Sequence, residues 1–143
     1  MNFPQFIDQV AAGCGVKLVR DEESRACVVF QGPNTLVMVY IAPRENLPNG
    51  DLLIEFFSVA KELPHDADVV EEVGYHLLLR NSTTGYAAWA FLVNENRYFI
   101  KATKNVLASE LDPEAFVEVV ASIAREYEYA TQLSQIGSTL WSE

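Results

Sequence analysis

The stretch from Asp66 to Lys104 decides the fold of this chain, and it reads DADVVEEVGYHLLLRNSTTGYAAWAFLVNENRYFIKATK. Its first half predicts an α-helix, because Asp66 can cap a first turn that is rich in acidic residues, as the helix dipole favours. The apolar positions of this helix recur at helical spacing and predict one buried stripe: Val70, Val73, Leu77 and Leu78. The polar residues 81–85 then end the helix.

The second half of the same stretch predicts a β-hairpin. Residues 86–93 form an apolar run, residues 94–96 (Asn-Glu-Asn) form a turn, and residues 97–103 form a second run. Trp89 and Phe91 fall on one face of the first strand because side chains alternate along a strand. A helix followed by a two-stranded hairpin is therefore the unit around which we place the remaining elements.

Composition limits the classes of function. At 143 residues the chain is long enough for one domain with a sizeable core, and half of its residues are hydrophobic. The net charge of −10 disfavours binding to nucleic acids or to anionic membranes, both of which require clustered Lys and Arg. The chain begins without a signal-peptide pattern and contains no run long enough to span a membrane, so we expect a cytoplasmic protein.

Further elements flank the central stretch. Residues 2–13 predict a short amphipathic helix with Phe3, Phe6, Ile7 and Val10 on its stripe. Residues 16–20, 26–30, 35–42 and 52–60 predict strands, and residues 43–50 predict a loop. The run 36–41 is apolar on both faces, as in a strand that is covered on both sides. Asp112-Pro113 begins a last helix, with Glu118, Arg125, Glu126 and Glu128 on its wet side.

The resulting order is helix, three or four strands, helix, two strands, helix. Short connections of this kind predict an α+β fold with a mainly antiparallel sheet and helices packed on it. We expect a single domain over residues 1–143, in which residues 131–143 form a tail that is flexible or contacts a partner.

Few residues suggest chemistry. Glu55 lies between apolar neighbours, which makes it an acid–base candidate with a raised pKa. Two structural roles explain it better: an ion pair with a Lys or Arg of a neighbouring strand, such as Lys101, or a charge that blocks pairing at a sheet edge. His65-Asp66-Ala67-Asp68 is the only local cluster of metal-type ligands, but the start of a helix explains it better than a metal site. His76, with Glu72 and Arg80, fits a solvated row of charges along a helix.

The two cysteines, Cys14 and Cys27, lack the spacing of zinc or redox motifs. We interpret them as free thiols, although a disulfide between them is an alternative that the sequence does not decide. The residues therefore predict no catalytic group, no metal and no cofactor.

The order of elements and several phrases resemble the type III secretion chaperone fold and the related YbjN-like bacterial domains. The phrases are DLLIEFFSVAKELP at 51–64, LLLRN at 77–81, Gly85, RYFIKAT at 97–103, and Leu107 and Leu111 before the last helix. Together they extend over nearly the whole chain. They consist of apolar patterns and turn residues rather than catalytic groups.

The resemblance implies a non-catalytic homodimer that holds a segment of another polypeptide, of unknown identity, on apolar patches. The first helix and an exposed sheet face would carry this binding, through Phe3, Phe6, Ile7, Val10, Phe57, Trp89 and Phe91. The second helix or the second-to-last strand would supply the dimer contact.

A different class of function stays open at this point. A pocket between sheet and helices would make the protein a small-ligand-binding domain or an enzyme, with Glu55, His65 and His76 as its titrating groups. A third alternative is a purely structural homodimer.

Overall fold

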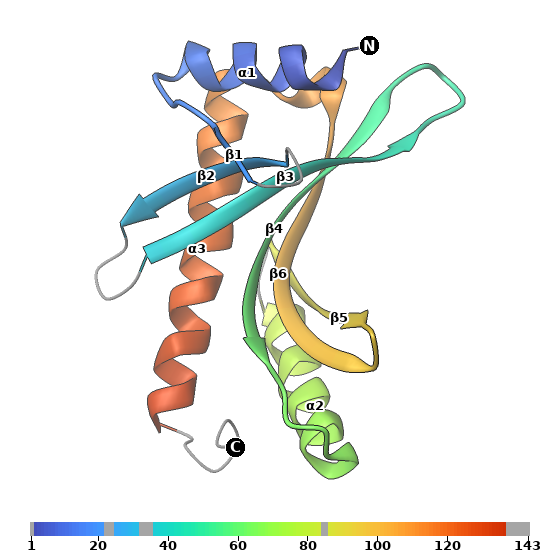
Figure 1. Ribbon diagram of the computed structural model, residues 1–143, viewed down its shortest axis with the longest axis vertical. Helices are drawn as coiled ribbons and strands as arrows, with labels where there is room; N and C mark the ends of the chain where they lie inside the picture. The colour runs from blue at the N-terminus through green and yellow to red at the C-terminus, as the bar shows by residue number, and fades with distance from the viewer. Residues whose placement is uncertain (1, 22–24, 32–35, 84–85, 137–143) are drawn as a thin grey trace.

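The structure is a computed structural model that describes residues 2–21, 25–31, 36–83 and 86–136. Figure 1 shows its elements in order. Their bounds are α1 Phe3–Gly13, β1 Val19–Arg20, β2 Ala26–Gln31, β3 Leu36–Asn46, β4 Leu52–Glu62, α2 Ala67–Thr83, β5 Ala88–Asn94, β6 Arg97–Leu107, a 3-10 turn Ala108–Glu110, and α3 Pro113–Ile136. The predicted α+β fold and its order of elements are confirmed.

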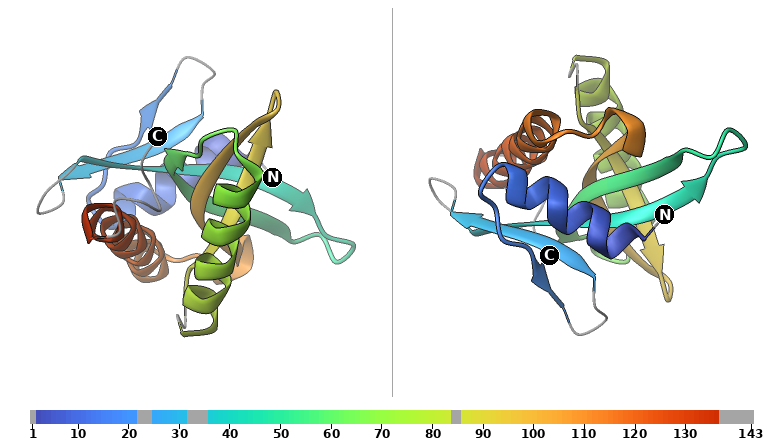
Figure 2. Two further views of the ribbon diagram at one scale, coloured as in Figure 1. Left: turned by 90° about the horizontal axis from the view of Figure 1, so that it is seen from below. Right: turned by 90° about the horizontal axis from the view of Figure 1, so that it is seen from above.

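The described strands form one sheet in the order β1-β2-β3-β4-β6-β5, and every neighbouring pair is antiparallel. Alternate residues of the central strands point toward the helices and are fully buried, among them Val39, Ile54 and Ile100. Helix α3 packs on this face, where Phe116 meets Phe56 edge to face with ring centroids 5.6 Å apart. Helix α2 lies beside α3 and packs on β5, as the view from below shows (Figure 2).

The three α-helices of the described chain begin where the sequence predicts. Asn2 Oδ1 accepts from the Gln5 backbone N–H at 3.0 Å, and Asp66 Oδ1 accepts from that of Asp68 at 2.9 Å. Asp112 caps α3 in the same way. Each cap satisfies a backbone donor that has no partner inside the helix.

The predicted loop over residues 43–50 is wrong, because β3 continues to Asn46. Its ladder with β4 shifts register between Pro43 and Glu45, which marks a β-bulge. Strand β2 pairs with β3 only as far as Ile41, so Pro43 has a strand neighbour on one side only. A proline, which lacks an N–H, is tolerated at such a position. The turn is confined to residues 47–50, where Gly50 adopts a φ of 88°.

The predicted burial is wrong for two helical residues. Leu78 was placed on the buried stripe of α2 but is 70% exposed, because Val73 and Leu77 already fill the contact with the core. Glu126, predicted on the wet side of α3, is buried. Arg80, predicted in a solvated row with Glu72 and His76, instead forms an ion pair with Glu126 at 2.8 Å. A carboxylate and a guanidinium that meet in this way can be buried together.

Candidate functional site

The sheet face opposite the helices is the surface that most resembles a binding site. None of the described helices covers it. Its exposed side chains include Val29, Leu36 and Met38, each at least 40% accessible. The prediction that both faces of residues 36–41 are covered is therefore wrong for Leu36 and Met38. We call this surface the open sheet face.

The sheet splits on this face. Strands β3 and β4 pair from Asn46↔Leu52 to Tyr40↔Phe57, and no further pair joins them within the described residues. Beyond that point β3 continues beside β2, whereas β4 continues beside β6. The two strands diverge visibly in Figure 1. The ladder of β4 with β6 shifts register between Val59 and Lys61, which marks a bulge in β4 just beyond the split.

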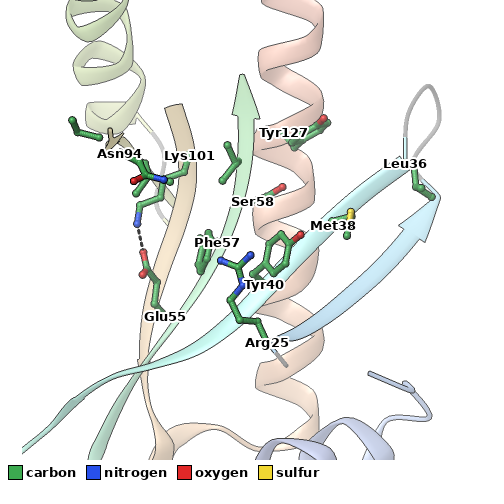
Figure 3. A pocket seen from close by; sticks show the side chains of 13 residues that line it. Arg25, Leu36, Met38, Tyr40, Glu55, Phe57, Ser58, Asn94, Lys101 and Tyr127 are labelled. Carbon is green, nitrogen blue, oxygen red and sulfur yellow. Dashed lines mark hydrogen bonds and ion pairs between the residues drawn. The ribbon is translucent and has the colours of Figure 1, made fainter. Parts of the chain in front are cut away.

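A cleft of about 670 Å³ lies at this split. Figure 3 shows its lining, which comes from β3, β4 and the end of β5, with single residues from β6, from α3 and from the segment before β2. The lining residues are Arg25, Leu36, Met38, Tyr40, Glu55, Phe57, Ser58, Val59, Leu92, Val93, Asn94, Lys101 and Tyr127. The volume is within the range of small-ligand sites, and the lining combines apolar with charged and polar side chains.

Two aromatic rings form the centre of the cleft. Tyr40 and Phe57 stack with their ring centroids 5.5 Å apart. The guanidinium of Arg25 lies 5.1 Å from the centroid of Tyr40, and the ammonium of Lys101 lies 5.1 Å from that of Phe57. Cations over aromatic faces stabilise this arrangement and keep the rings in place for contact with an apolar group.

Glu55 forms the polar wall of the cleft. Its Oε2 accepts hydrogen bonds from Lys101 Nζ at 2.8 Å and from Thr103 Oγ1 at 2.6 Å, and Arg44 lies 3.5 Å from Oε1. Burial alone raises the pKa of Glu55, but the hydrogen bonds from Lys101 and Thr103 and the charges of Lys101 and Arg44 outweigh it. The pKa therefore lies below its ordinary value.

The predicted ion pair of Glu55 with Lys101 is thus confirmed, and the acid–base interpretation with a raised pKa is wrong. A carboxylate with a lowered pKa is a poor proton donor near neutral pH.

The histidines do not share this cleft. His65 borders a separate cavity of about 280 Å³ at the start of α2, with its ring 6.3 Å from that of Tyr98. His76 is exposed on α2. Among the described residues, no group of three His, Cys, Asp or Glu side chains is arranged to hold a metal ion. Cys14 and Cys27 are free thiols, as favoured from their spacing.

The seven residues predicted for partner binding are dispersed. Ile7, Val10 and Trp89 belong to the buried core and present almost no surface. Phe3 and Phe6 are half-buried against that core. Of the seven, only Phe57 lines the cleft, while Phe91 lies on the helix side of β5.

Sequence reasoning missed Met38, Tyr40, Val59 and Arg25. The signal for the first two was present, because they alternate with the core residues Val37, Val39 and Ile41 on one strand. The position of the split was not readable, since it depends on how far two strands stay paired.

A second apolar surface lies on the outside of α2 and on β5, which is an edge strand of the sheet. Its members are exposed, and they are Tyr75, Leu78, Leu79 and Phe91. Helix α2 and β5 approach each other at Gly74, where an added Cβ would lie only 3.2 Å from the Phe91 ring. We call this the α2–β5 surface.

Comparison of the chain with protein-family models, with characterised proteins and with solved structures yields no significant match. In the part of the chain that the structure describes, no helix has both the length and the apolar character needed to cross a membrane.

Proposed function

We propose that this protein is a non-catalytic protein-binding module, similar to secretion chaperones or YbjN-like regulators, that holds a partner polypeptide on apolar patches as a homodimer. The observation that carries the proposal is the open sheet face, where Val29, Leu36 and Met38 remain exposed. Clustered apolar side chains on the surface of a small domain favour contact with another polypeptide.

The α2–β5 surface supports the homodimer. Tyr75 and Leu78 are 61% and 70% exposed on a helix that otherwise packs on the sheet. They adjoin β5, whose outer edge has no strand neighbour in the described sheet. An edge strand flanked by apolar residues suits an isologous contact, in which the same patch is used by both copies. The proposed contact uses α2 and β5, and the family resemblance implies one or the other of these two elements.

The test uses a polypeptide that cannot fold, reduced and carboxymethylated lysozyme. The purified protein should suppress its aggregation and co-elute with it in size-exclusion chromatography, with light scattering giving a dimer plus one bound chain. A dimer that neither binds the unfolded chain nor slows its aggregation would contradict the proposal.

The alternative function is small-ligand binding or catalysis in the cleft. It is favoured by one observation, the Glu55–Lys101–Thr103 cluster on the wall of a cavity of about 670 Å³. A thermal-shift screen of metals and metabolites separates the two functions. A ligand that raises the melting temperature of the wild type but not of Glu55→Gln would support the alternative.

A further inference from the structure

The split between β3 and β4 leaves two strands with a neighbour on one side only. If the register of Tyr40↔Phe57 continued, Val39 would face Ser58 and Met38 would face Val59, but these pairs do not form in the described structure. On their other sides, Met38 pairs with Val29 and Val59 pairs with Lys101. Each strand therefore turns one edge toward the cleft.

The two edges border the cleft differently. From β4, the consecutive residues Phe57, Ser58 and Val59 all line it, although alternate residues of a strand point to opposite faces. The backbone of β4 is therefore part of the cleft wall. From β3, only the alternate residues Leu36, Met38 and Tyr40 line the cleft, so β3 contributes side chains from one face.

A wall of this kind matches the chemistry of an extended polypeptide. The unpaired edge of a strand presents N–H and C=O groups that another strand can bind. Apolar side chains on one side of the added strand would pack on Met38 and Tyr40. A compact metabolite would use the cavity volume but would leave a row of backbone groups without partners.

We propose that the split is the subsite where a partner polypeptide adds a short strand to the edge of β4 beyond Phe57. The inference rests on the proposed function and specifies how the partner is recognised: through its backbone, with apolar residues at alternate positions. The segment is short, because β4 ends at Glu62 and the cleft wall includes only Ser58 and Val59 beyond the last pair with β3.

The test uses a short fluorescein-labelled peptide of alternating threonine and valine, measured by fluorescence anisotropy. Two control peptides carry N-methyl groups on the threonine or on the valine nitrogens, which remove backbone donors and keep the side chains. One of the two methylated peptides should bind more than about tenfold more weakly than the unmodified peptide. A tenfold change in affinity corresponds to about 1.4 kcal/mol. The other methylated peptide should lose less affinity, because the N–H groups of alternate residues point to opposite sides of a strand.

Substitutions in the cleft test whether the peptide binds there. Met38→Lys and Val59→Lys introduce charge into the cleft and should weaken peptide binding more than about tenfold. Val117→Lys is the matched control, because Val117 is an exposed valine on α3 outside the cleft lining. Peptide addition should also slow amide hydrogen exchange at Ser58 or Val59 in the wild type.

The outcomes separate this inference from the proposed function. If all three peptides bind equally well, or if both cleft variants bind the peptide as tightly as the wild type, the β4 subsite is wrong. If the wild type still binds unfolded lysozyme in that case, the proposed function stands. If the wild type binds neither the peptide nor unfolded lysozyme, both the β4 subsite and the proposed function are wrong. If the cleft variants instead turn a dimer into a monomer, the occupant of the split is a second copy, and the partner-strand proposal is wrong.

Discussion

Glu126 and Trp89 are joined by a buried hydrogen bond, in which the indole Nε1 donates to Glu126 Oε1 over 2.9 Å. The same carboxylate accepts two hydrogen bonds from Arg80, from Nε at 3.0 Å and from Nη2 at 2.8 Å. Arg80 in turn covers the ring of Tyr129 at 3.9 Å from its centroid. One side chain of α3 thereby fixes α2 and β5 relative to each other.

Replacing Glu126 should therefore destabilise the whole fold. Glu126→Leu leaves the Arg80 charge and the Trp89 N–H without their acceptor, and we expect a loss of about 3–5 kcal/mol in the free energy of unfolding. Glu126→Gln keeps one acceptor oxygen and should cost less. Urea denaturation, followed by tryptophan fluorescence, gives both values.

The exposed pair Arg97–Glu62 provides the control, because its bidentate geometry is similar but water surrounds it. Glu62→Leu should change stability little. If Glu126→Leu and Glu62→Leu had the same effect, the buried carboxylate would not hold the elements together as inferred.

This carboxylate also shows where sequence analysis failed. The period of α3 indicates which residues face the core, and Phe116, Val120 and Ile123, which follow that period, are buried. Glu126 was assigned to water because of its charge, and its partners are 46 and 37 positions away in the sequence. Hydrogen bonds between distant elements leave no periodic signal.

Patterns among neighbouring residues predict the secondary structure better than they predict the cleft. The caps at Asn2, Asp66 and Asp112 were readable because each involves residues only two or three positions apart. The cleft was not readable, because it exists where the pairing of β3 with β4 stops. The apolar residues chosen for binding were mostly core residues, since composition alone does not separate a buried apolar face from an exposed one.

The charge state of Glu55 gives a pH-dependent prediction. Its pKa is lowered in the folded protein from an ordinary value of 4.5, so its ionised form stabilises the fold. The contribution is fully present above pH 4.5 and is lost as the pH falls through the lower folded-state pKa. Glu55→Gln should therefore reduce the free energy of unfolding by about 1–3 kcal/mol at pH 7.

The measurement is the difference in stability between wild type and Glu55→Gln, by urea denaturation at several pH values. The difference should be constant from pH 7 to pH 5 and should shrink at lower pH. Glu118→Gln, a substitution at an exposed position of α3, should show no comparable difference in stability from the wild type. A gap for Glu55→Gln that grew as the pH fell would mean that the carboxylate is destabilised by the fold.

The junction of α1 with α3 depends on Gly13. A Cβ at this position would lie 2.7 Å from Cγ of Pro113, which is closer than real side chains approach. Gly13→Ala should gain about 1 kcal/mol from helix propensity but lose about 1–3 kcal/mol from overlap with the proline ring. We expect net destabilisation in thermal or urea unfolding.

A double-mutant cycle with Pro113→Ala isolates this contact. Removing the ring should make Gly13→Ala neutral or stabilising, so that the two substitutions couple favourably. Additive effects would show that the close approach of Gly13 to Pro113 does not limit packing.

The α2–β5 surface gives the test of assembly. Leu78 is among its most exposed members, so Leu78→Glu should leave the fold of the monomer unchanged while placing a buried charge at the proposed dimer interface. We expect light scattering and sedimentation to show a monomer for Leu78→Glu at concentrations where the wild type is a dimer. Circular dichroism and the melting curve of the dissociated wild type should match those of the variant. Val117→Glu places the same charge at an exposed apolar position on the other long helix, 48% accessible, and should stay dimeric. If Leu78→Glu remained a dimer while Val117→Glu dissociated, the interface would lie on α3 rather than on α2 and β5.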